Sequence, residues 1–347
     1  MKTASLIDAC HPKYKKVVIV AMSGNMLINF SGPADVFTNA NLFLLESGTE
    51  AGYDVSIVSP TESKIIKTPT GMEIRCTHSA MDLQIPIDTL IIAGNHLSEF
   101  EGESYAPFFN WLAGVNERNT RRTGSVCGGA FALAKAGLLN GRKATTHWDL
   151  SDKLRKRFPL VQVDTNPFVT TDGNIYTSGG VSSGIDLALA MVEEDYGKDL
   201  AIKVARKLVF YLNRPGYQAQ FGDLLPMYES TNIAGKLQDW FKEHLHEPMD
   251  VSRIADHLNM SRRNFTRVFH KQTGLPPAKF IEKLRIETAR KYLENTDTNI
   301  EIIADKCGLG SMVSMRRTFF RHLMITPSDY RRAFRSSLTT PSIEDFV

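Results

Sequence analysis

One cysteine, Cys127, stands where an α/β protein would expose a reactive side chain. The segment 125–130 reads Ser-Val-Cys-Gly-Gly-Ala, a short apolar strand that turns sharply into a predicted helix. A side chain on such a turn is exposed at the carboxyl edge of the sheet, beside the free amides of the helix N-terminus. Those amides favour the thiolate, so the sequence predicts a lowered pKa for Cys127.

A histidine further along the chain, His147, could serve as a base for this thiol or form a wall of a pocket. Cys127 itself has several open interpretations: a small residue that fits the turn, a ligand contact without chemistry, a nucleophile, or a redox-sensitive thiol. The segment 176–184 leads into another helix and supplies a second set of N-terminal amides. Together the two turns predict a pocket for a small ligand that carries a carboxylate.

The C-terminal hundred residues carry a helical pattern that occurs twice. The first copy contains Ile254-Ala255-Asp256, Ser261, Arg267, Phe269, Pro277 and Phe280, and the second Ile303-Ala304-Asp305, Ser311, Arg317, Phe319, Pro327 and Tyr330. A short helix, a tight turn, a serine cap and a basic amphipathic helix describe a helix-turn-helix unit. Two such units in tandem can read two successive major grooves of DNA. DNA binding is therefore the first functional hypothesis.

The second helix of each unit is expected to lie in the groove, with Ser261 and Ser311 as its N-caps. The residues expected to pack inward are Phe265, Val268, Phe269, Met315 and Phe319. The candidates for contact with bases or phosphates are Arg262, Arg263, Asn264, Thr266, Arg267, Lys271, Ser311, Met312, Ser314, Arg316 and Arg321.

The charge of the chain supports this interpretation, although its net value is only +3. Residues 251–335 hold 17 Lys and Arg against 8 Asp and Glu, whereas the other residues hold 24 against 30. A basic module joined to a mildly acidic one indicates a polyanionic partner for the basic module alone. An alternative for three basic residues is structural, because Arg263, Arg267 and Arg317 could pair with carboxylates such as Asp256 and Asp305.

The elements that position these residues follow from the hydrophobic pattern. Strands are expected at 17–20, 53–58, 89–93 and 124–126, with helices at 33–47, 105–119, 129–136 and 198–212. This alternation predicts a doubly wound α/β domain over 14–212 with a mostly parallel sheet. Residues 213–230 are expected as a linker, and 231–335 as an all-α domain with helix-turn-helix units at about 250–272 and 300–323.

Composition excludes several other classes. No apolar run approaches the ~20 residues that span a bilayer, so no membrane association is expected. Residues 1–16 have no apolar core of a signal peptide, and the four cysteines are scattered without metal-ligand spacing. We therefore expect a cytoplasmic chain with reduced thiols, no metal and no cofactor.

The C-terminal residues resemble the AraC family of transcriptional regulators over about 233–334, including the connecting helix that contains Leu284-Arg285 and 289–293. The N-terminal part resembles a flavodoxin-like PfpI-type domain, related to class I amidotransferases, over about 17–212. Such a domain is joined to an AraC module in the GlxA family of regulators. The resemblance implies a DNA-binding transcriptional regulator, usually an activator of amino acid or amine catabolism. Promoter DNA, a small effector, a second copy of the chain and RNA polymerase are its implied partners.

The resemblance also implies an effector site around the cysteine turn. Its candidate residues are Gly32, Pro33, Asn95, His96, Cys127, Gly128, His147, Trp148, Gly180 and Val181. Three departures from related enzymes argue against catalysis. Gly128 stands where PfpI-like peptidases have histidine, Asn29 replaces an acid before Gly-Pro, and Asn95-His96 replaces a Gly-Gly that could form an oxyanion hole. Cys127 and His147 are thus vestigial candidates, and a DNA-tethered cysteine hydrolase or deglycase and a thiol redox sensor are the alternatives.

The second helix-turn-helix unit departs from the AraC pattern at one turn. Met324 stands where the family has the glycine that the first unit keeps as Gly274. If this position is left-handed, methionine costs about 1 kcal/mol relative to glycine, so a reshaped turn is expected. Because Met312 also lies on the outward face, the first unit is expected to carry more of the base specificity.

Overall fold

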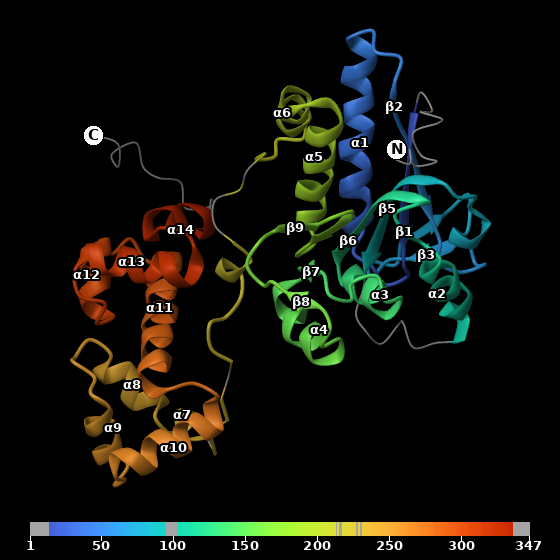
Figure 1. Cartoon of the computed structure of the whole chain (residues 1–347). Coiled ribbons are helices and arrows are strands. Elements are labelled where there is room, and N and C mark those ends of the chain that lie inside the picture. The colour runs from blue at the N-terminus through green and yellow to red at the C-terminus, as the bar shows by residue number, and fades with distance from the viewer. Residues whose placement is uncertain are drawn as a thin grey trace, which may run out of the picture. The chain divides into compact units, whose positions relative to one another are not determined.

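The computed structural model describes residues 14–94, 103–212, 214, 217–226, 228–229 and 231–335 (Figure 1). The chain divides into two compact units, Met1–Arg214 and Pro215–Val347. Each unit has its own hydrophobic core, so each is described by itself.

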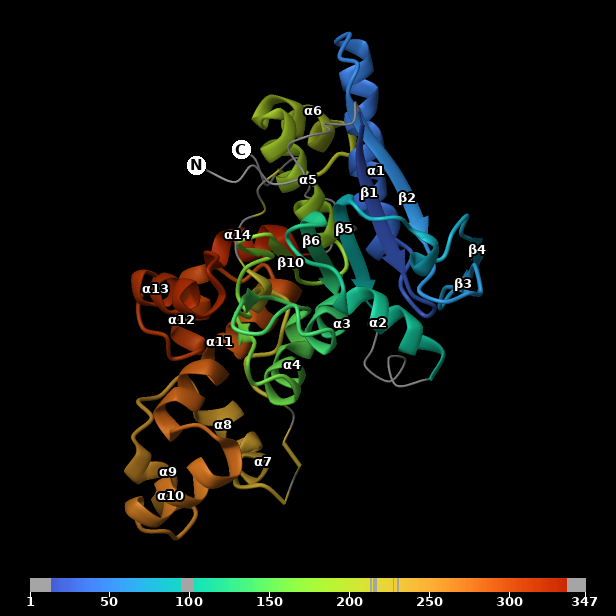
Figure 2. The same ribbon diagram turned by 45° about the vertical axis from the view of Figure 1, so that its right-hand side comes forward.

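The first unit is built on a six-stranded sheet of order β2-β1-β5-β6-β10-β9 (Figure 2). Its strands are β1 (Tyr14–Ala21), β2 (Gly52–Val58), β5 (Ile87–Gly94), β6 (Thr120–Cys127), β9 (Val169–Asp172) and β10 (Ile175–Ser178). All neighbours pair in parallel except β9 and β10. The predicted mostly parallel, flavodoxin-like sheet is confirmed.

Helices cover both faces of this sheet, which explains the continuous apolar strands. Val17 and Ile19 pack against α1 (Ile28–Glu46), α5 (Ser183–Tyr196) and α6 (Lys198–Lys207) on one face. Val18 and Val20 pack on the other face against α2 (Ala106–Ala113), α3 (Gly129–Lys135) and α4 (Ser151–Arg157). All four valine and isoleucine side chains are fully buried, as a doubly wound sheet requires.

Several short elements lie outside the predicted pattern. They are the antiparallel hairpin β3 (Ile65–Lys67) and β4 (Glu73–Arg75), the pair β7 (Lys143–Ala144) and β8 (Gln162–Val163), and the 3-10 turns η1 (Ala80–Asp82), η3 (Glu103–Tyr105) and η4 (Trp148–Leu150). The helices expected at 105–119 and 198–212 were also too long, because they end at Ala113 and Lys207.

The second unit is helical throughout. Its elements are η5 (Gln218–Gln220), α7 (Ile233–Lys236), α8 (Gln238–His244), α9 (Val251–His257), α10 (Arg262–Thr273), α11 (Pro277–Asn295), α12 (Ile300–Lys306), α13 (Met312–Leu323) and α14 (Pro327–Phe334). One core surrounds Phe265 and Phe269, and another surrounds Met315 and Phe319. The long helix α11 contributes residues to both cores and so connects them.

Part of the segment expected as a linker packs within the second unit. The Arg290 guanidinium on α11 donates hydrogen bonds to the carbonyl oxygens of Gly222 (2.7 Å) and Gln220 (3.0 Å). The Leu224 amide donates to the Glu287 carboxylate at 2.8 Å. Residues 220–224 are therefore held on α11 by buried polar contacts.

Among the described residues, no helix has both the length and the apolar content that crossing a bilayer requires.

Candidate DNA-binding surface and effector site

Polar side chains cap the first two helices of each helix-turn-helix unit. The Ser261 hydroxyl accepts from the Asn264 amide at 3.4 Å, and the Ser311 hydroxyl accepts from the Ser314 amide at 3.3 Å. The shorter helices α9 and α12 are capped by Asp250 and Asn299. The side-chain cap satisfies one of the amides that have no partner at each helix start, so both recognition helices begin where the sequence predicts.

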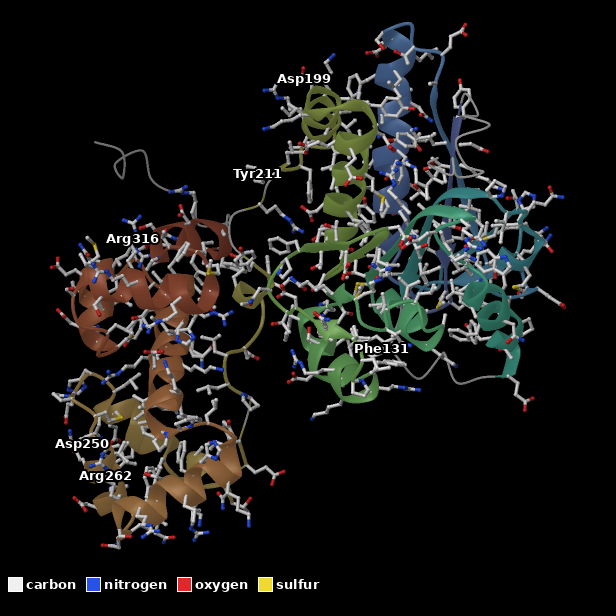
Figure 3. All side chains as sticks on the ribbon, in the orientation of Figure 1. Phe131, Asp199, Tyr211, Asp250, Arg262 and Arg316 are labelled. Atoms are coloured by element: carbon white, nitrogen blue, oxygen red, sulfur yellow. The ribbon has the colours of Figure 1, made fainter. Side chains whose placement is uncertain are left out.

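The two recognition helices, α10 and α13, bury their predicted inward faces. Phe265, Phe269, Met315 and Phe319 are all 0% exposed. The opposite faces are exposed: Arg262 on α10 and Arg316 on α13 lie at the outside of the second unit, where Figure 3 labels them. Each helix is thus fixed from behind by its core and presents its other face to solvent.

The structural alternative for three arginines finds no support. Within the described residues no ion pair joins Arg263, Arg267 or Arg317 to Asp256 or Asp305. Arg267 instead donates to the Asn264 side chain on its own helix at 3.0 Å.

Three other predicted contact residues already have partners within the unit. The Thr266 hydroxyl donates to the Arg262 carbonyl at 2.9 Å, and Ser311 is the helix cap. The Arg321 guanidinium lies 3.5 Å from Glu282 of α11. Arg262, Arg263, Lys271, Met312, Ser314 and Arg316 are exposed.

The turn after each recognition helix is left-handed in both units. Gly274 has φ 73° and Met324 has φ 54°, and their amides donate to the carbonyls of His270 (2.9 Å) and Phe320 (2.8 Å). The expected reshaping of the second turn is wrong, because methionine adopts the conformation that glycine has in the first unit. The turn of the second unit therefore has the same geometry as that of the first, although a left-handed backbone is unfavourable for any residue that has a Cβ atom.

The cysteine turn has the predicted sharp geometry. Cys127 ends β6 with φ 56°, its amide donates to the Gly179 carbonyl at 3.0 Å, and its carbonyl accepts from the Thr146 hydroxyl at 2.7 Å. A Cβ at Gly94 would lie 1.5 Å from the Gly129 nitrogen. Only glycine permits this close approach of β5 to the turn.

The predicted lowering of the Cys127 pKa is wrong. Burial raises the pKa of the Cys127 thiol to about 11, although a hydrogen bond from the Gly128 amide acts in the opposite direction. The thiol is therefore protonated at neutral pH, because little water reaches it to stabilise the thiolate. A redox sensor or nucleophile at this position would need the opposite shift.

His147 lies near the cysteine turn, and its ring contacts the backbone of the residues that follow it. Its Nδ1 accepts from the Asp149 amide at 3.2 Å, so the neutral ring carries its proton on Nε2. Its Cδ2 would be 3.1 Å from a Cβ at Gly180. Cys127, Gly128, His147 and Gly180 are thus brought into one region through Thr146 and Gly179.

The other predicted effector residues that the structure describes lie next to this region, because Trp148 and Val181 follow His147 and Gly180 in the chain and a Cβ at Gly184 would lie 3.1 Å from Val126. Gly32 and Pro33 are buried in α1, where a Cβ at Gly184 would meet the Pro33 ring at 3.0 Å. Trp148 and Val181 are half-buried, and Asn95 and His96 lie outside the described residues. Asn29 is 3% exposed and its Nδ2 donates to the Gly94 carbonyl at 3.2 Å, a contact that a carboxylate could not make.

Sequence reasoning missed Arg214, the last residue of the first unit. Its guanidinium pairs with Asp186 and donates to the hydroxyls of Ser182 (3.1 Å) and Ser183 (3.3 Å) at the start of α5. It also lies 4.3 Å from the centre of the Phe168 ring. An isolated arginine after a helix gives no sequence signal, since its partners are about 30 residues away.

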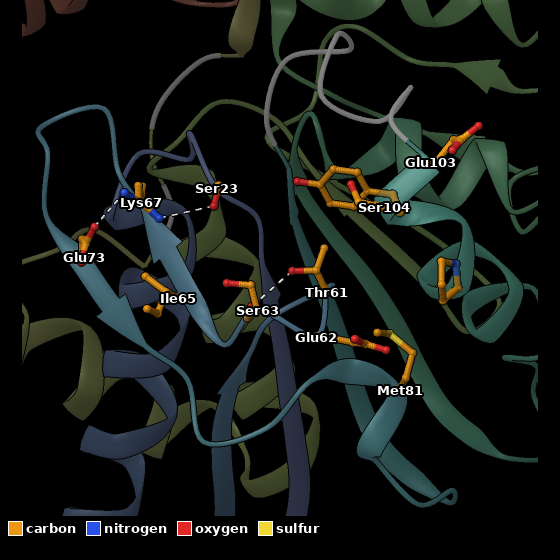
Figure 4. Close-up of a pocket in the computed structure, with 12 residues that line it drawn as sticks. Ser23, Thr61, Glu62, Ser63, Ile65, Lys67, Glu73, Met81, Glu103 and Ser104 are labelled. Atoms are coloured by element: carbon orange, nitrogen blue, oxygen red, sulfur yellow. Dashed lines mark hydrogen bonds and ion pairs between the residues drawn. The ribbon is translucent and has the colours of Figure 1, made fainter.

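A cavity of about 750 Å³ opens beside the carboxyl ends of β1 and β2 (Figure 4). Its charged lining residues are Glu62, Lys67, Glu73 and Glu103. The Lys67 ammonium lies 2.8 Å from Glu73, so the carboxylates of Glu62 and Glu103 leave the cavity with an excess of negative charge. None of the predicted effector residues that the structure describes lines it, because the cysteine turn follows β6, two strands away from β1.

The fold and these surfaces define a chain in which an α/β domain with a cysteine turn precedes a tandem helix-turn-helix domain. Residues 15–194 match the model of the DJ-1/PfpI family, and residues 254–333 match that of a helix-turn-helix domain. The chain belongs to the DJ-1/PfpI family, and its second unit is an AraC-type DNA-binding module.

Three curated relatives illustrate the similarity. The chain is 32% identical to the HTH-type transcriptional regulator GbdR of Pseudomonas aeruginosa over 62% of this chain and 59% of that protein. It is 29% identical to the regulator GlxA of Rhizobium meliloti over 61% of this chain and 65% of that protein. It is also 31% identical to isonitrile hydratase of Pseudomonas putida over 46% of this chain and 68% of that enzyme. The matches thus span less than two thirds of the length of the two regulators.

Proposed function

We propose that this protein is a sequence-specific, DNA-binding transcriptional regulator, most simply an activator. The single observation that carries the proposal is the pair of capped recognition helices, α10 and α13, each with a complete core behind it and an exposed face with arginines. A helix that is fixed in this way can enter a major groove without refolding. The excess of basic residues in 251–335 supplies the attraction to phosphates.

The proposed DNA contacts are the exposed residues of α10 and α13 predicted from the sequence. We propose the largest contributions for Arg262 and Arg316, since both guanidinium groups are exposed and can reach a base edge or a phosphate. Four other residues already make contacts within their own unit, so we propose that they contribute less to the free energy of DNA binding. They are Asn264, Thr266, Arg267 and Arg321. Ser311 serves as cap and phosphate neighbour.

Selection from a random duplex pool with the full chain tests this function. We expect enrichment of a sequence with two half-sites, and Arg262→Ala should relax the base preference in one half-site by about 1–3 kcal/mol. Glu46→Ala, at the end of α1 in the other unit, is the control and should leave the selection unchanged. Equal binding of selected and random duplexes by the unaltered chain would remove the proposal.

For the first unit we propose effector sensing, with the cavity of Glu62, Lys67, Glu73 and Glu103 as the binding place. Within the described residues, the carboxylates of Glu62 and Glu103 have no ammonium partner, which favours a ligand with a positive charge, so an amine or an amino acid is the proposed class. The residues of the cysteine turn stay a predicted second contact region for such a ligand.

A thermal-shift screen of the full chain with amines, amino acids and carboxylic acids separates the two regions. A ligand present at 100 times its Kd should stabilise the first unit by about 2.7 kcal/mol. Glu62→Gln with Glu103→Gln should abolish the shift if the cavity binds the ligand, whereas Gly180→Ala should abolish it if the cysteine turn does. Glu46→Gln is the matched control. A shift given only by carboxylic acids would contradict the amine class.

We further propose that Arg214 transmits the effector signal. It bonds the start of α5, which follows the Gly180 turn, and it immediately precedes the segment that leads to the second unit. Arg214→Met should leave DNA affinity without effector unchanged and remove the effect of the effector on it. Arg206→Met, on the exposed side of α6, is the matched control. An unchanged effector response in Arg214→Met would refute this route.

The chain is proposed not to be an enzyme, because burial raises the pKa of the Cys127 thiol and the His147 Nδ1 already accepts a hydrogen bond from the Asp149 amide. The similarity to isonitrile hydratase favours one alternative, a cysteine-dependent hydratase or hydrolase held on DNA. Turnover of an isonitrile or amide by the full chain, lost in Cys127→Ala, would establish that alternative. A thiol redox sensor would require thiol titration well below pH 8.

A homodimer, RNA polymerase as a second protein partner, and a cytoplasmic location complete the proposal. These three proposals rest on the proposed function as a transcriptional regulator, and not on any contact within the chain.

A further inference from the structure

The two recognition surfaces differ in chemistry at equivalent positions. With the repeat offset of 50 residues, Arg262, Arg263 and His270 of the first unit correspond to Met312, Val313 and Phe320 of the second. With the offset of 49 in the preceding helix, Arg253 corresponds to Ile302. Four positions that are basic or polar in the first unit are thus apolar in the second.

These four apolar side chains are not part of the core. Ile302 is 49% exposed, Met312 53%, Val313 55% and Phe320 47%. The core behind them is complete without them, because Met315, Phe319 and Leu323 are fully buried. Single exposed apolar residues are common on proteins, but four in one helix-turn-helix unit, at positions that are polar or basic in the other unit, indicate a partner.

The charges on the same helix indicate which partner. Arg316 and Arg317 are exposed beside Met312 and Val313, so the surface is both apolar and positively charged. Met312, Val313 and Arg316 also line a hollow of about 360 Å³ together with Thr326–Asp329 at the start of α14. A polyanion that presents apolar groups in a groove fits this combination.

Thymine is the base with such a group in the major groove. Its 5-methyl group projects there, whereas guanine presents two acceptors that suit arginine. Methionine and valine have no hydrogen-bond donor to offer, and recognition helices contact bases through their N-terminal residues. Met312 and Val313 occupy the first two positions of α13.

We propose that the second unit reads thymine 5-methyl groups through Met312 and Val313, whereas the first unit reads guanine through Arg262 and Arg263. This inference rests on the proposed DNA-binding function and adds the base class of each half-site. Arg316 and Arg317 supply the phosphate contacts that hold α13 in its groove. The stretch of DNA that one chain contacts is then asymmetric, with a guanine-containing half-site and a thymine-rich one.

Deoxyuridine substitution tests this base class, because it removes the methyl group and leaves every hydrogen-bonding group of the base pair. The probe is the duplex selected from a random pool by the full chain. The half-site whose base preference relaxes in Arg262→Ala is assigned to the first unit. Each thymine of the other half-site is then replaced singly by deoxyuridine, and affinity is measured by fluorescence anisotropy.

We expect one or two deoxyuridine substitutions in the second half-site to weaken binding about three- to fourfold each, the value of one buried methyl group. In Met312→Ala with Val313→Ala the same substitutions should have no further effect. Arg262→Ala is the matched control and should keep the full response to deoxyuridine. No response to deoxyuridine in either half-site, with selectivity intact, overturns the inference and leaves the regulator proposal in place.

Two other results have distinct meanings. Absence of any selected sequence refutes the DNA-binding function itself, and the inference with it. If Met312→Ala with Val313→Ala binds DNA and responds to deoxyuridine as the unaltered chain does, but no longer activates transcription with purified RNA polymerase, the apolar surface contacts protein. That result also overturns the inference.

Discussion

The two helix-turn-helix units share an interior and differ in their surfaces. Phe269 and Phe319 occupy equivalent core positions with no exposure, and Ser261 and Ser311 make the same cap. The exposed positions diverge, as Arg262 and Met312 illustrate. A cap contributes about 1 kcal/mol and a buried phenylalanine about 3–5 kcal/mol, so folding constrains these positions strongly. Solvent-facing positions carry no such constraint and can specialise.

A second difference concerns the contact that ties each recognition helix to the helix before its unit. In the first unit Gln272 accepts from the Ile233 amide at 2.8 Å, and the Asn232 side chain donates to the Gln272 carbonyl at 3.3 Å. At the equivalent positions of the second unit, His322 and Glu282 lie 2.8 Å apart. This contact, which we call the tie of each unit, is therefore made by uncharged groups in the first unit and by two titratable side chains in the second.

The largest effect should come from the shared interior. Phe269→Ala and Phe319→Ala should each destabilise their unit by about 3–4 kcal/mol, because both leave a cavity in a closed core. Hydrogen exchange of the α10 and α13 amides in the full chain measures the two opening free energies separately. Phe320→Ala, an exposed neighbour, is the control and should change stability by less than about 0.5 kcal/mol. A cost below about 1 kcal/mol in only one unit would show that the interiors are not equivalent.

The interiors and caps were predictable because their signals are local and repeated. The spacing of Phe265 and Phe269, the serine caps and the apolar run Val17–Val20 each follow from a few neighbouring residues. The hairpin of β3 and β4 was missed because its strands are only three residues long, which is too short for a periodic apolar pattern.

The error on Cys127 has a different origin. The favourable amides of the turn are local, but the burial that raises its pKa to about 11 comes from the packing of distant strands. The same holds for the contacts of Arg214 and for the pair of Glu282 and His322, which join residues about 30 to 40 positions apart. Such contacts depend on tertiary structure and leave no pattern in neighbouring residues.

The next effect in size concerns the two surfaces on DNA. Arg262→Ala with Arg263→Ala should weaken binding by about 1–3 kcal/mol for each base contact that the arginines make. The slope of log affinity against log salt should fall by about 1 for each phosphate that they neutralise. Met312→Ala with Val313→Ala should leave that slope unchanged, since neither side chain is charged. Equal changes of this slope in both double variants would contradict the proposal that the first unit contacts DNA through charged side chains and the second through apolar ones.

A smaller effect is expected at the left-handed turns. Met324→Gly should stabilise the second unit by up to about 1 kcal/mol, because glycine adopts a positive φ without steric cost. Gly274→Ala should destabilise the first unit by about the same amount. Urea unfolding of both variants, followed by hydrogen exchange of the adjacent helices, gives the two values. Destabilisation by Met324→Gly would mean that the methionine side chain contributes packing that outweighs the strain.

The smallest effect should be a difference between the two units in how their stability depends on pH. Burial acts to raise the pKa of Glu282, but the hydrogen bond with His322 and the charges of Arg321 and Lys279 outweigh it and hold the pKa below its ordinary value. A lowered carboxyl pKa stabilises the fold above the unfolded value of about 4.3, and this contribution is lost as pH falls through the folded pKa. The opening free energy of α13 should therefore decline below about pH 4.3 more than that of α10, by a few tenths of a kcal/mol to about 1 kcal/mol.

Substitution of each tie isolates this contribution from the other carboxylates of the unit. Glu282→Gln should lower the stability of α13 at pH 6 and remove its excess decline in acid, because glutamine does not titrate. Asn232→Ala, the matched change in the first unit, should lower the stability of α10 equally at both pH values. An acid decline that persists in Glu282→Gln would assign the difference to other carboxylates, and the ties would then differ in composition without differing in their response to pH.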